Sequence, residues 1–294
     1  MNPTAENDFS TGSIPAHMLR LALPMTLAQL INVLYNIIDR IFIGRIPFDS
    51  TNALTGLGVA FPICTITIAF ANLVGMGGAP LFSIERGKRN DAEAEKILGN
   101  SFVLLLLFGL FITITGLLLK RPLLYLPGAS EATFRYADSY ITIYLCGSVF
   151  VMLSLGLNSF INAQGFAKTG MLTVLIGAVC NIVLDPLFIF VFHMGVKGAA
   201  LATILSQGVS CVWVCTFLRG KKTLLRLKNE NIRLRPQYFL PCVALGAASF
   251  IMQASESVIS VCFNTSLLKY GGDIAVGAMT ILTSVMQFAM LPLQ

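Results

Sequence analysis

Long runs of hydrophobic residues, separated by short polar stretches, recur along the entire chain. Each run approaches or exceeds the roughly 20 residues that an α-helix needs to cross the hydrocarbon core of a bilayer. The pattern therefore predicts an all-α polytopic membrane protein with about eight spanning helices. The predicted helices cover residues 21–46, 53–84, 92–119, 134–163, 171–192, 199–218, 240–268 and 275–293.

A basic stretch, RGKKTLLRLKNENIRLRPQ, divides the chain after the sixth predicted helix. The segments STNALTGLGVAF and GGDIAVGAMTIL, on either side of it, share a polar turn followed by small residues, which suggests an internal repeat. We expect a six-helix N-lobe at residues 1–218, a cytoplasmic linker at 219–237, and the first two helices of a second, repeat-related lobe at 238–294. The chain stops inside a hydrophobic run, so we also expect it to be the front part of a longer protein.

The distribution of charge agrees with a membrane location. Of the 294 residues, 55% are hydrophobic and 12% are charged, whereas soluble domains carry about one quarter charged residues. The basic residues gather after the second, fourth and sixth predicted helices, at Arg86, Lys168 and Lys221 for example. The positive-inside rule therefore places these stretches and the N-terminus in the cytoplasm. Topology accounts for the net charge of +6, with anionic lipid as a secondary partner, and no nucleic-acid partner is expected.

Two predicted helices carry acidic residues at membrane depth, where an ionisable group is costly and is by default a functional candidate. In the first helix, Tyr35 and Asp39 are four residues apart and share one face. In the fifth, Asn181 and Asp185 have the same spacing. Both aspartates lie about two turns before the outer end of a helix that runs outward, so we expect them at similar depth. The sequence thus predicts that two carboxylates face a shared chamber.

Other predicted helices offer polar groups to the same chamber, including Asn158 on the fourth and Thr203 on the sixth. Carboxylate, amide, phenol and hydroxyl groups together could hold a proton, a sodium ion or a cationic guest. The simpler alternative is that Asp39 pairs with Arg40, and that Asp185 bonds only to neighbouring backbone. Residues one apart on a helix do not face each other, so an Asp39–Arg40 pair is not automatic.

Prolines and one further acid are also candidates. Pro24 and Pro186 each remove a backbone hydrogen bond from a predicted helix, so either could permit bending or free a carbonyl group as a cation ligand. A kink that only shapes the packing is the alternative. Glu256 is an acid within the seventh predicted helix, the counterpart of the first if the repeat holds.

The chain resembles the MATE family, the multidrug and toxic compound extrusion transporters. The resemblance rests on LALPMTLAQLINVLYNIIDRIFIG, on LNSFINAQGFAKTGMLTVLIGAVCNIVLDPLFIF and on GVKGAALATILSQ, in this order and spacing. It implies twelve helices in two six-helix lobes, of which this chain would supply the first lobe and the opening two helices of the second. It also implies a multi-pass protein of the bacterial-type plasma (inner) membrane, monomeric when full length.

The resemblance further implies which residues bind the coupling ion or substrate. It places the cation site of the N-lobe on Tyr35, Asp39, Asn158, Asn181, Asp185 and Thr203, with the bending proline at Pro24 and a second-lobe acid at Glu256. Sodium, if it is the coupling ion, would bind at Asp39 and Asp185. We expect no cofactor; a proton or a sodium ion is the coupling ion.

The expected function is secondary active efflux of small organic cations in exchange for protons or sodium ions, by alternating access. A MATE-related flippase or metabolite exporter is the alternative. A remote third possibility is an intramembrane aspartyl protease, in which two carboxylates share a proton and activate water. That family places its acids in YD and GxGD contexts, whereas Asp39 follows Ile38 and Asp185 follows Leu184. We therefore expect no enzymatic activity.

Overall fold

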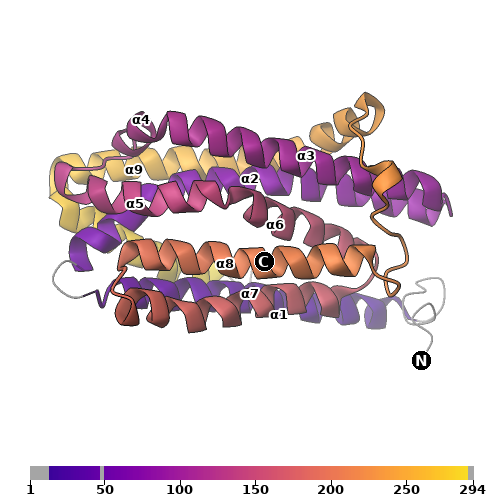
Figure 1. The fold of residues 1–294 in the computed structure, drawn as a ribbon, viewed down its shortest axis with the longest axis horizontal. Coiled ribbons are helices and arrows are strands. Elements are labelled where there is room, and N and C mark those ends of the chain that lie inside the picture. The colour runs from indigo at the N-terminus through magenta and orange to yellow at the C-terminus, as the bar shows by residue number, and fades with distance from the viewer. Residues whose placement is uncertain (1–12, 47–49, 291–294) are drawn as a thin grey trace.

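The computed structural model describes residues 13–46 and 50–290. Within these ranges every regular element is helical, which confirms the all-α prediction (Figure 1). The elements are α1 (Ile14–Ile43), α2 (Ser50–Gly87), α3 (Asp91–Leu118), α4 (Lys120–Tyr125), α5 (Glu131–Cys146), α6 (Ser148–Ala163), α7 (Ala167–Pro186), the π-helical turn η1 (Leu187–Val191), α8 (Val196–Arg219), the 3₁₀ turn η2 (Asn229–Asn231) and α9 (Pro236–Met290).

The predicted helix at residues 134–163 is broken into α5 and α6, which are bent by 57°. The break falls at Gly147, whose ψ of 6° is not helical. A Cβ atom at this position would overlap the side chain of Ile204 on α8. Glycine therefore allows α8 to approach where the helix turns, a contact that a hydrophobic pattern alone does not reveal.

The last two predicted helices correspond to α9, on either side of Gly272, which has a positive φ of 66°. Positions 291–293 of the last predicted helix lie outside the described residues. Asn264 donates a hydrogen bond to the Gly58 carbonyl oxygen at 3.2 Å. Thr280 also packs directly on Gly58, where a Cβ would overlap its hydroxyl group. Because Asn264 and Thr280 lie eight residues before and after Gly272, the chain reverses its direction there.

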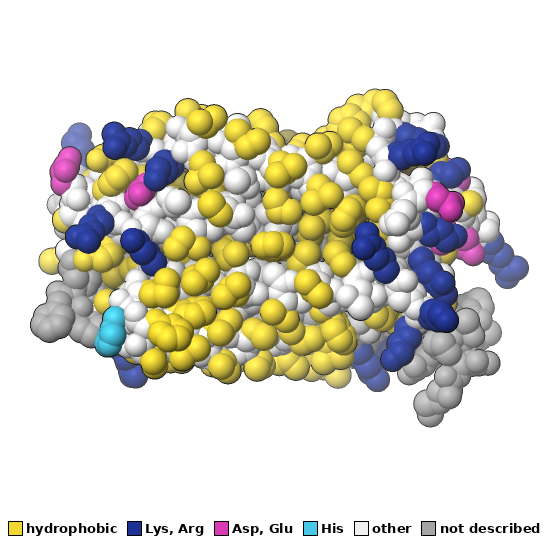
Figure 2. Space-filling model, viewed as in Figure 1, with side chains coloured by type: hydrophobic (Ala, Val, Ile, Leu, Met, Phe, Trp, Pro, Cys, Tyr) yellow, Lys and Arg dark blue, Asp and Glu magenta, His cyan; other side chains and the backbone are white. Residues whose placement is uncertain are grey.

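Both features affect the count of membrane spans, because the bent α5–α6 pair can form a single span and α9 contains two helices. The described residues contain six helices long and apolar enough to cross a membrane, or seven if the bent α5–α6 pair is one span, with α9 counted once. Figure 2 shows hydrophobic side chains over the middle of the visible face and basic side chains toward its two ends. This distribution is that of a multi-pass membrane protein.

Helix α2 occupies the centre of the bundle and packs against α3, α5, α6 and α9. Glycines at the contact between α2 and α9 allow the two helices to approach each other closely. A Cβ on Gly77 would overlap the carbonyl oxygen of Cys242, and one on Gly246 of α9 would overlap the backbone of Leu73. Small residues of this kind are the usual means by which membrane helices pack closely. The fold thus joins α9 to α2 by direct backbone contact.

The linker at residues 219–237 is folded onto the ends of α3 and α6. Gln164, which is fully buried, accepts hydrogen bonds from the backbone N–H groups of Leu224 at 3.1 Å and Leu225 at 3.0 Å. Its amide nitrogen donates to the Leu225 carbonyl oxygen at 3.2 Å. Glu95 on α3 forms an ion pair with Lys228 at 2.7 Å. The linker is therefore part of the packed structure as well as a connection.

Candidate ion site between α1 and α7

Two buried carboxyl groups meet where α1 packs against α7. Asp39, near the end of α1, is 8% exposed, and Asp185, near the end of α7, is fully buried. Their side chains lie within hydrogen-bonding contact of each other. The structure thus brings together the two aspartates that the sequence places on one face of each helix.

The oxygen atoms of this pair are only partly satisfied. Asn181 donates from Nδ2 to Oδ1 of Asp185 at 3.2 Å, one helical turn away. Three buried oxygens have no hydrogen-bond partner among the described residues: Oδ1 of Asp39, Oδ2 of Asp185 and Oδ1 of Asn181. Buried polar atoms are usually hydrogen-bonded, and a buried charge needs a partner. The arrangement therefore suits a shared proton or a bound cation.

The same oxygens fit the chemistry of a sodium site. Carboxylate and amide oxygens are hard ligands of the kind that alkali and alkaline-earth cations prefer. No group of three or more His, Cys, Asp or Glu side chains that could hold a metal ion occurs among the described residues. A cation here would be held by Asp39, Asp185 and the Asn181 amide, with further oxygens from backbone or water.

Aromatic hydroxyl groups form a second layer around the pair. Tyr35 is one turn before Asp39, is half-buried, and lies close enough to interact electrostatically with both aspartates. Tyr140 of α5 is buried, interacts electrostatically with Asp39 and lies close to the Thr203 side chain. Thr203 itself donates to the Ala199 carbonyl oxygen at 3.0 Å. Thr203 thus reaches the pair through Tyr140.

The structure adds Tyr140 and its neighbour Tyr144 to this layer, although the sequence does not predict them as site residues. Both are buried, and their rings stack at a centroid distance of 6.1 Å. Tyr144 also interacts electrostatically with Tyr35 and with Cys64 of α2. The sequence feature that points to them is YITIY, in which two tyrosines lie one helical turn apart in an apolar run.

Two predicted site residues are not brought to the carboxyl pair. Asn158 of α6 donates to the Gly170 carbonyl oxygen at 3.3 Å, and 15 residues of α7 separate Gly170 from Asp185, which is about 22 Å along a helix. Glu256 is exposed on α9, and no described contact joins it to Asp39 or Asp185. Its neighbour Ser257 points the other way and donates to the Pro62 carbonyl oxygen at 2.9 Å.

The two prolines have different local effects. Helix α1 continues without interruption through Pro24, which is buried. Pro186 ends α7 and is followed directly by the π-helical turn η1. A π turn inside a helix is uncommon and is often found at functional sites. The widened turn therefore lies next to Asp185.

Arg40, adjacent to Asp39, joins α1 to the last part of α9. Its Nη1 donates to the Thr280 carbonyl oxygen at 2.9 Å, and its guanidinium group lies 5.3 Å from the centre of the Phe61 ring. Thr280 follows the reversal at Gly272. Because Arg40 directly follows Asp39 in α1, a displacement of Asp39 would also move Arg40 and so change its contact with α9.

Long apolar helices packed around a buried carboxyl pair define this chain as a multi-pass membrane protein. Comparison with known proteins identifies which kind. The MatE family model matches residues 24–187, and the chain belongs to this family.

Relatives and solved structures agree with this assignment. The multidrug export protein MepA of Staphylococcus haemolyticus (strain JCSC1435) is 27% identical over 263 residues, which are 90% of this chain and 58% of MepA. The MATE multidrug transporter DinF-BH, whose structure has been solved, is 32% identical, with a TM-score of 0.92 over 97% of this chain and 64% of that one. An inward-facing multidrug resistance MATE transporter of the MOP superfamily is 26% identical, with a TM-score of 0.84 over 94% of this chain and 62% of that one. The chain thus spans about three fifths of the length of these relatives.

Proposed function

We propose that this chain forms the larger part of a multidrug exporter that moves small organic cations outward in exchange for protons or sodium ions. The observation that carries the proposal is the contact between two buried carboxyl groups, Asp39 and Asp185, contributed by different helices. The relatives described as multidrug export proteins support the substrate class. The coupling ion would bind at the pair, with Asn181 and Tyr35 beside it.

The physical basis for coupling is repulsion between like charges. Two carboxylates held in contact away from water are stable together only if a proton or a cation sits between them. A coupling ion and an organic cation would therefore compete to neutralise the same pair. Entry of the coupling ion would favour a closer approach of α1 to α7, which shifts the population toward the state that has released the drug.

Helix α1 is suited to rearrange in such a cycle. Pro24 removes one backbone hydrogen bond from the helix, and the Arg40–Thr280 hydrogen bond connects its far end to α9. In this scheme alternating access arises when α1 and α7 change their packing around the occupied pair. We further propose a monomer in a bacterial plasma membrane, with the N-terminus and the linker in the cytoplasm on the basis of the positive-inside rule.

The test is efflux of a fluorescent organic cation from bacterial cells that lack their own pumps, with the complete reading frame expressed. Asp185→Asn should abolish efflux at matched membrane expression, because an amide can neither carry the proton nor balance a cation's charge. Asp91→Asn is the matched control, since Asp91 is exposed in the first turn of α3 and the chemical change is identical. Imposed proton and sodium gradients would then identify the ion.

The possible outcomes separate the candidate functions. Efflux by the wild type and by Asp91→Asn, but not by Asp185→Asn, supports the proposal. Equal efflux by Asp185→Asn rejects the carboxyl pair as the coupling site. If the wild type exports no organic cation, a lipid or metabolite substrate replaces the multidrug assignment.

A further inference from the structure

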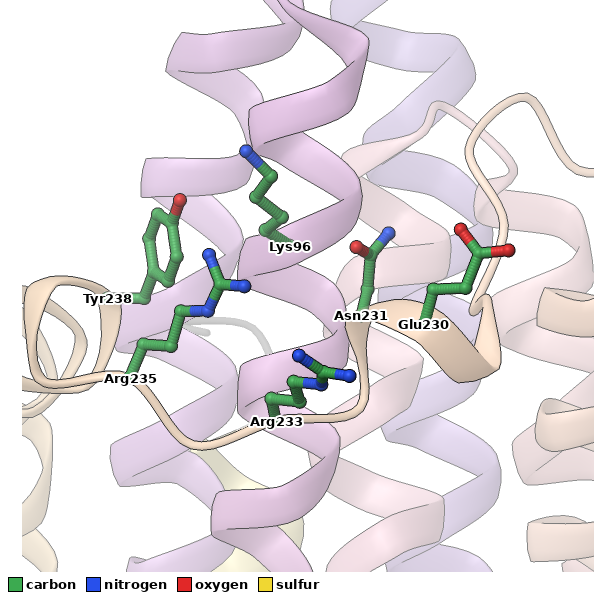
Figure 3. A pocket seen from close by; sticks show the side chains of 6 residues that line it. All are labelled: Lys96, Glu230, Asn231, Arg233, Arg235 and Tyr238. Carbon is green, nitrogen blue, oxygen red and sulfur yellow. The ribbon is translucent and has the colours of Figure 1, made fainter.

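A group of basic side chains gathers where the linker meets the starts of α3 and α9. Lys96, Arg233, Arg235 and Tyr238, together with Glu230 and Asn231, line a small hollow (Figure 3). Lys96 comes from the first turns of α3, the arginines from the linker, and Tyr238 from the first turn of α9. Two segments that are distant in sequence, α3 and the linker, thus place three cationic side chains around one opening.

The charges around this hollow are unequally paired. Glu93 forms an ion pair with Lys96 at 2.6 Å and accepts a hydrogen bond from the Tyr238 hydroxyl group. No ion pair is formed by the guanidinium group of Arg233 or Arg235 with any described acid, although Arg235 also lies within the electrostatic reach of Glu93. Glu230 stands on the far side of Asn231 from Arg235 in Figure 3. Two arginine forks are therefore available to an anion.

The backbone that carries these arginines is held firmly on α3. Asn100 donates from Nδ2 to the Arg235 carbonyl oxygen at 3.0 Å. The Asn231 backbone packs directly on Gly99, where a Cβ would overlap its carbonyl oxygen. The N–H group of Tyr238 donates to the same Arg235 carbonyl at 3.1 Å as α9 begins. The two arginines thus project from a backbone of defined geometry.

Apolar side chains adjoin these cations. Leu234, between the two arginines, is 46% exposed, and Leu240, in the second turn of α9, is 59% exposed. From Tyr238 onward the helix is predominantly apolar. Basic residues that immediately precede a membrane helix on its cytoplasmic side lie at the level of the lipid headgroups, where anionic lipids give the surface a negative potential. Exposed leucines beside them would meet the acyl chains.

We propose that Arg233 and Arg235, with Lys96 behind them, bind the phosphate of an anionic phospholipid in the cytoplasmic leaflet. Guanidinium groups suit this ligand because their planar fork matches two phosphate oxygens at once. The phosphate sits at the mouth of the hollow, and Leu234 and Leu240 contact the chains of the same lipid. The bound lipid holds the linker, and through it the start of α9, at the membrane surface.

The test measures binding of short-chain phosphatidylglycerol to the complete protein purified in detergent, with phosphatidylcholine and inorganic phosphate as separate probes. The variant Arg233→Gln/Arg235→Gln should bind phosphatidylglycerol about tenfold or more weakly than the wild type. The matched control is Lys221→Gln/Lys222→Gln, which removes the same charge from exposed positions of the same linker outside the hollow. The control should bind within about twofold of the wild type.

Each alternative has its own signature. Equal weakening by the two double variants would mean that only the net charge of the linker attracts lipid, which overturns the site. Equal affinity for phosphatidylcholine would also overturn it, because that headgroup has no net charge. Inorganic phosphate that binds as tightly as phosphatidylglycerol would replace the lipid with a soluble anion. Drug efflux does not enter this test, so its result is independent of the proposed function.

Discussion

Helices α1 and α2 are both long and apolar, yet they occupy opposite positions in the bundle. In the most apolar part of α2, 67% of the residues are buried, whereas in α1 only 6% are. Helix α1, which has little buried surface, carries Asp39 of the candidate ion site. Helix α2, at the centre, carries glycines that allow α9 to pack closely against it. Regions with few buried contacts are the ones that open and rearrange at low free-energy cost. We therefore expect α1 to move more readily than the seam between α2 and α9, where Gly77 meets Cys242 and Gly246 meets Leu73.

Overpacking the seam should produce the largest effect. Gly77→Leu places a side chain against the Cys242 backbone of α9, so α2 and α9 must separate. Misfits of this kind typically cost about 1–3 kcal/mol, and more where backbone blocks the side chain. We expect a sharp fall in the melting temperature in detergent. Gly208→Leu on α8, where nothing lies within 4 Å, should leave it nearly unchanged; equal losses would argue against a rigid seam.

Neutralising the carboxyl pair should have the opposite effect on stability. In sodium-free buffer at alkaline pH, Asp39 and Asp185 repel each other, so Asp185→Asn should raise the melting temperature by the equivalent of about 0.5–2 kcal/mol. Efflux should be lost to the same extent in Asp39→Asn, Asp185→Asn and the double variant, because the two residues act as one unit. Additive losses would show that the aspartates act separately.

A smaller effect is expected at the connection between the two regions. Arg40→Gln removes the charged donor from the Thr280 carbonyl oxygen, and an ordinary intramolecular hydrogen bond contributes about 0.5–1.5 kcal/mol net. We expect a modest fall in melting temperature together with weaker dependence of efflux on the imposed ion gradient. Arg45→Gln, at an exposed position in the turn after α1, is the control. Unchanged gradient dependence in Arg40→Gln would remove this residue from the coupling path.

Much of the ion site follows from local sequence. The spacing of four residues between Asn181 and Asp185 places both on one face of α7, and their hydrogen bond is made within that helix. The sequence also predicts that the first and fifth helices both run outward, from which we expect Asp39 and Asp185 to lie at one depth. Tyr140, in contrast, joins the site because α5 packs beside α2 and α8, a neighbourhood that no spacing along the chain specifies.

The linker illustrates the same limit. Its lysines and arginines predict a cytoplasmic location, but nothing in its pattern shows that Gln164 binds the backbone at Leu224 and Leu225. Leu225 and Leu227 are buried, and their burial depends on how far apart the ends of α3 and α6 lie in the fold. The division into two lobes and the roles of Asn158, Thr203 and Glu256 remain predictions.

Local physics and long-range packing thus determined different properties of this protein. Hydrophobic run length and helical periodicity act within about 20 residues, so the sequence by itself determined the helices, the membrane location and the faces that carry Asp39 and Asp185. Only the tertiary structure decided the break at Gly147, the docking of the linker and the contact between the two carboxyl groups. Each of these depends on which helices meet, and that is set by packing among residues that can be more than 100 positions apart, as Asp39 and Asp185 are.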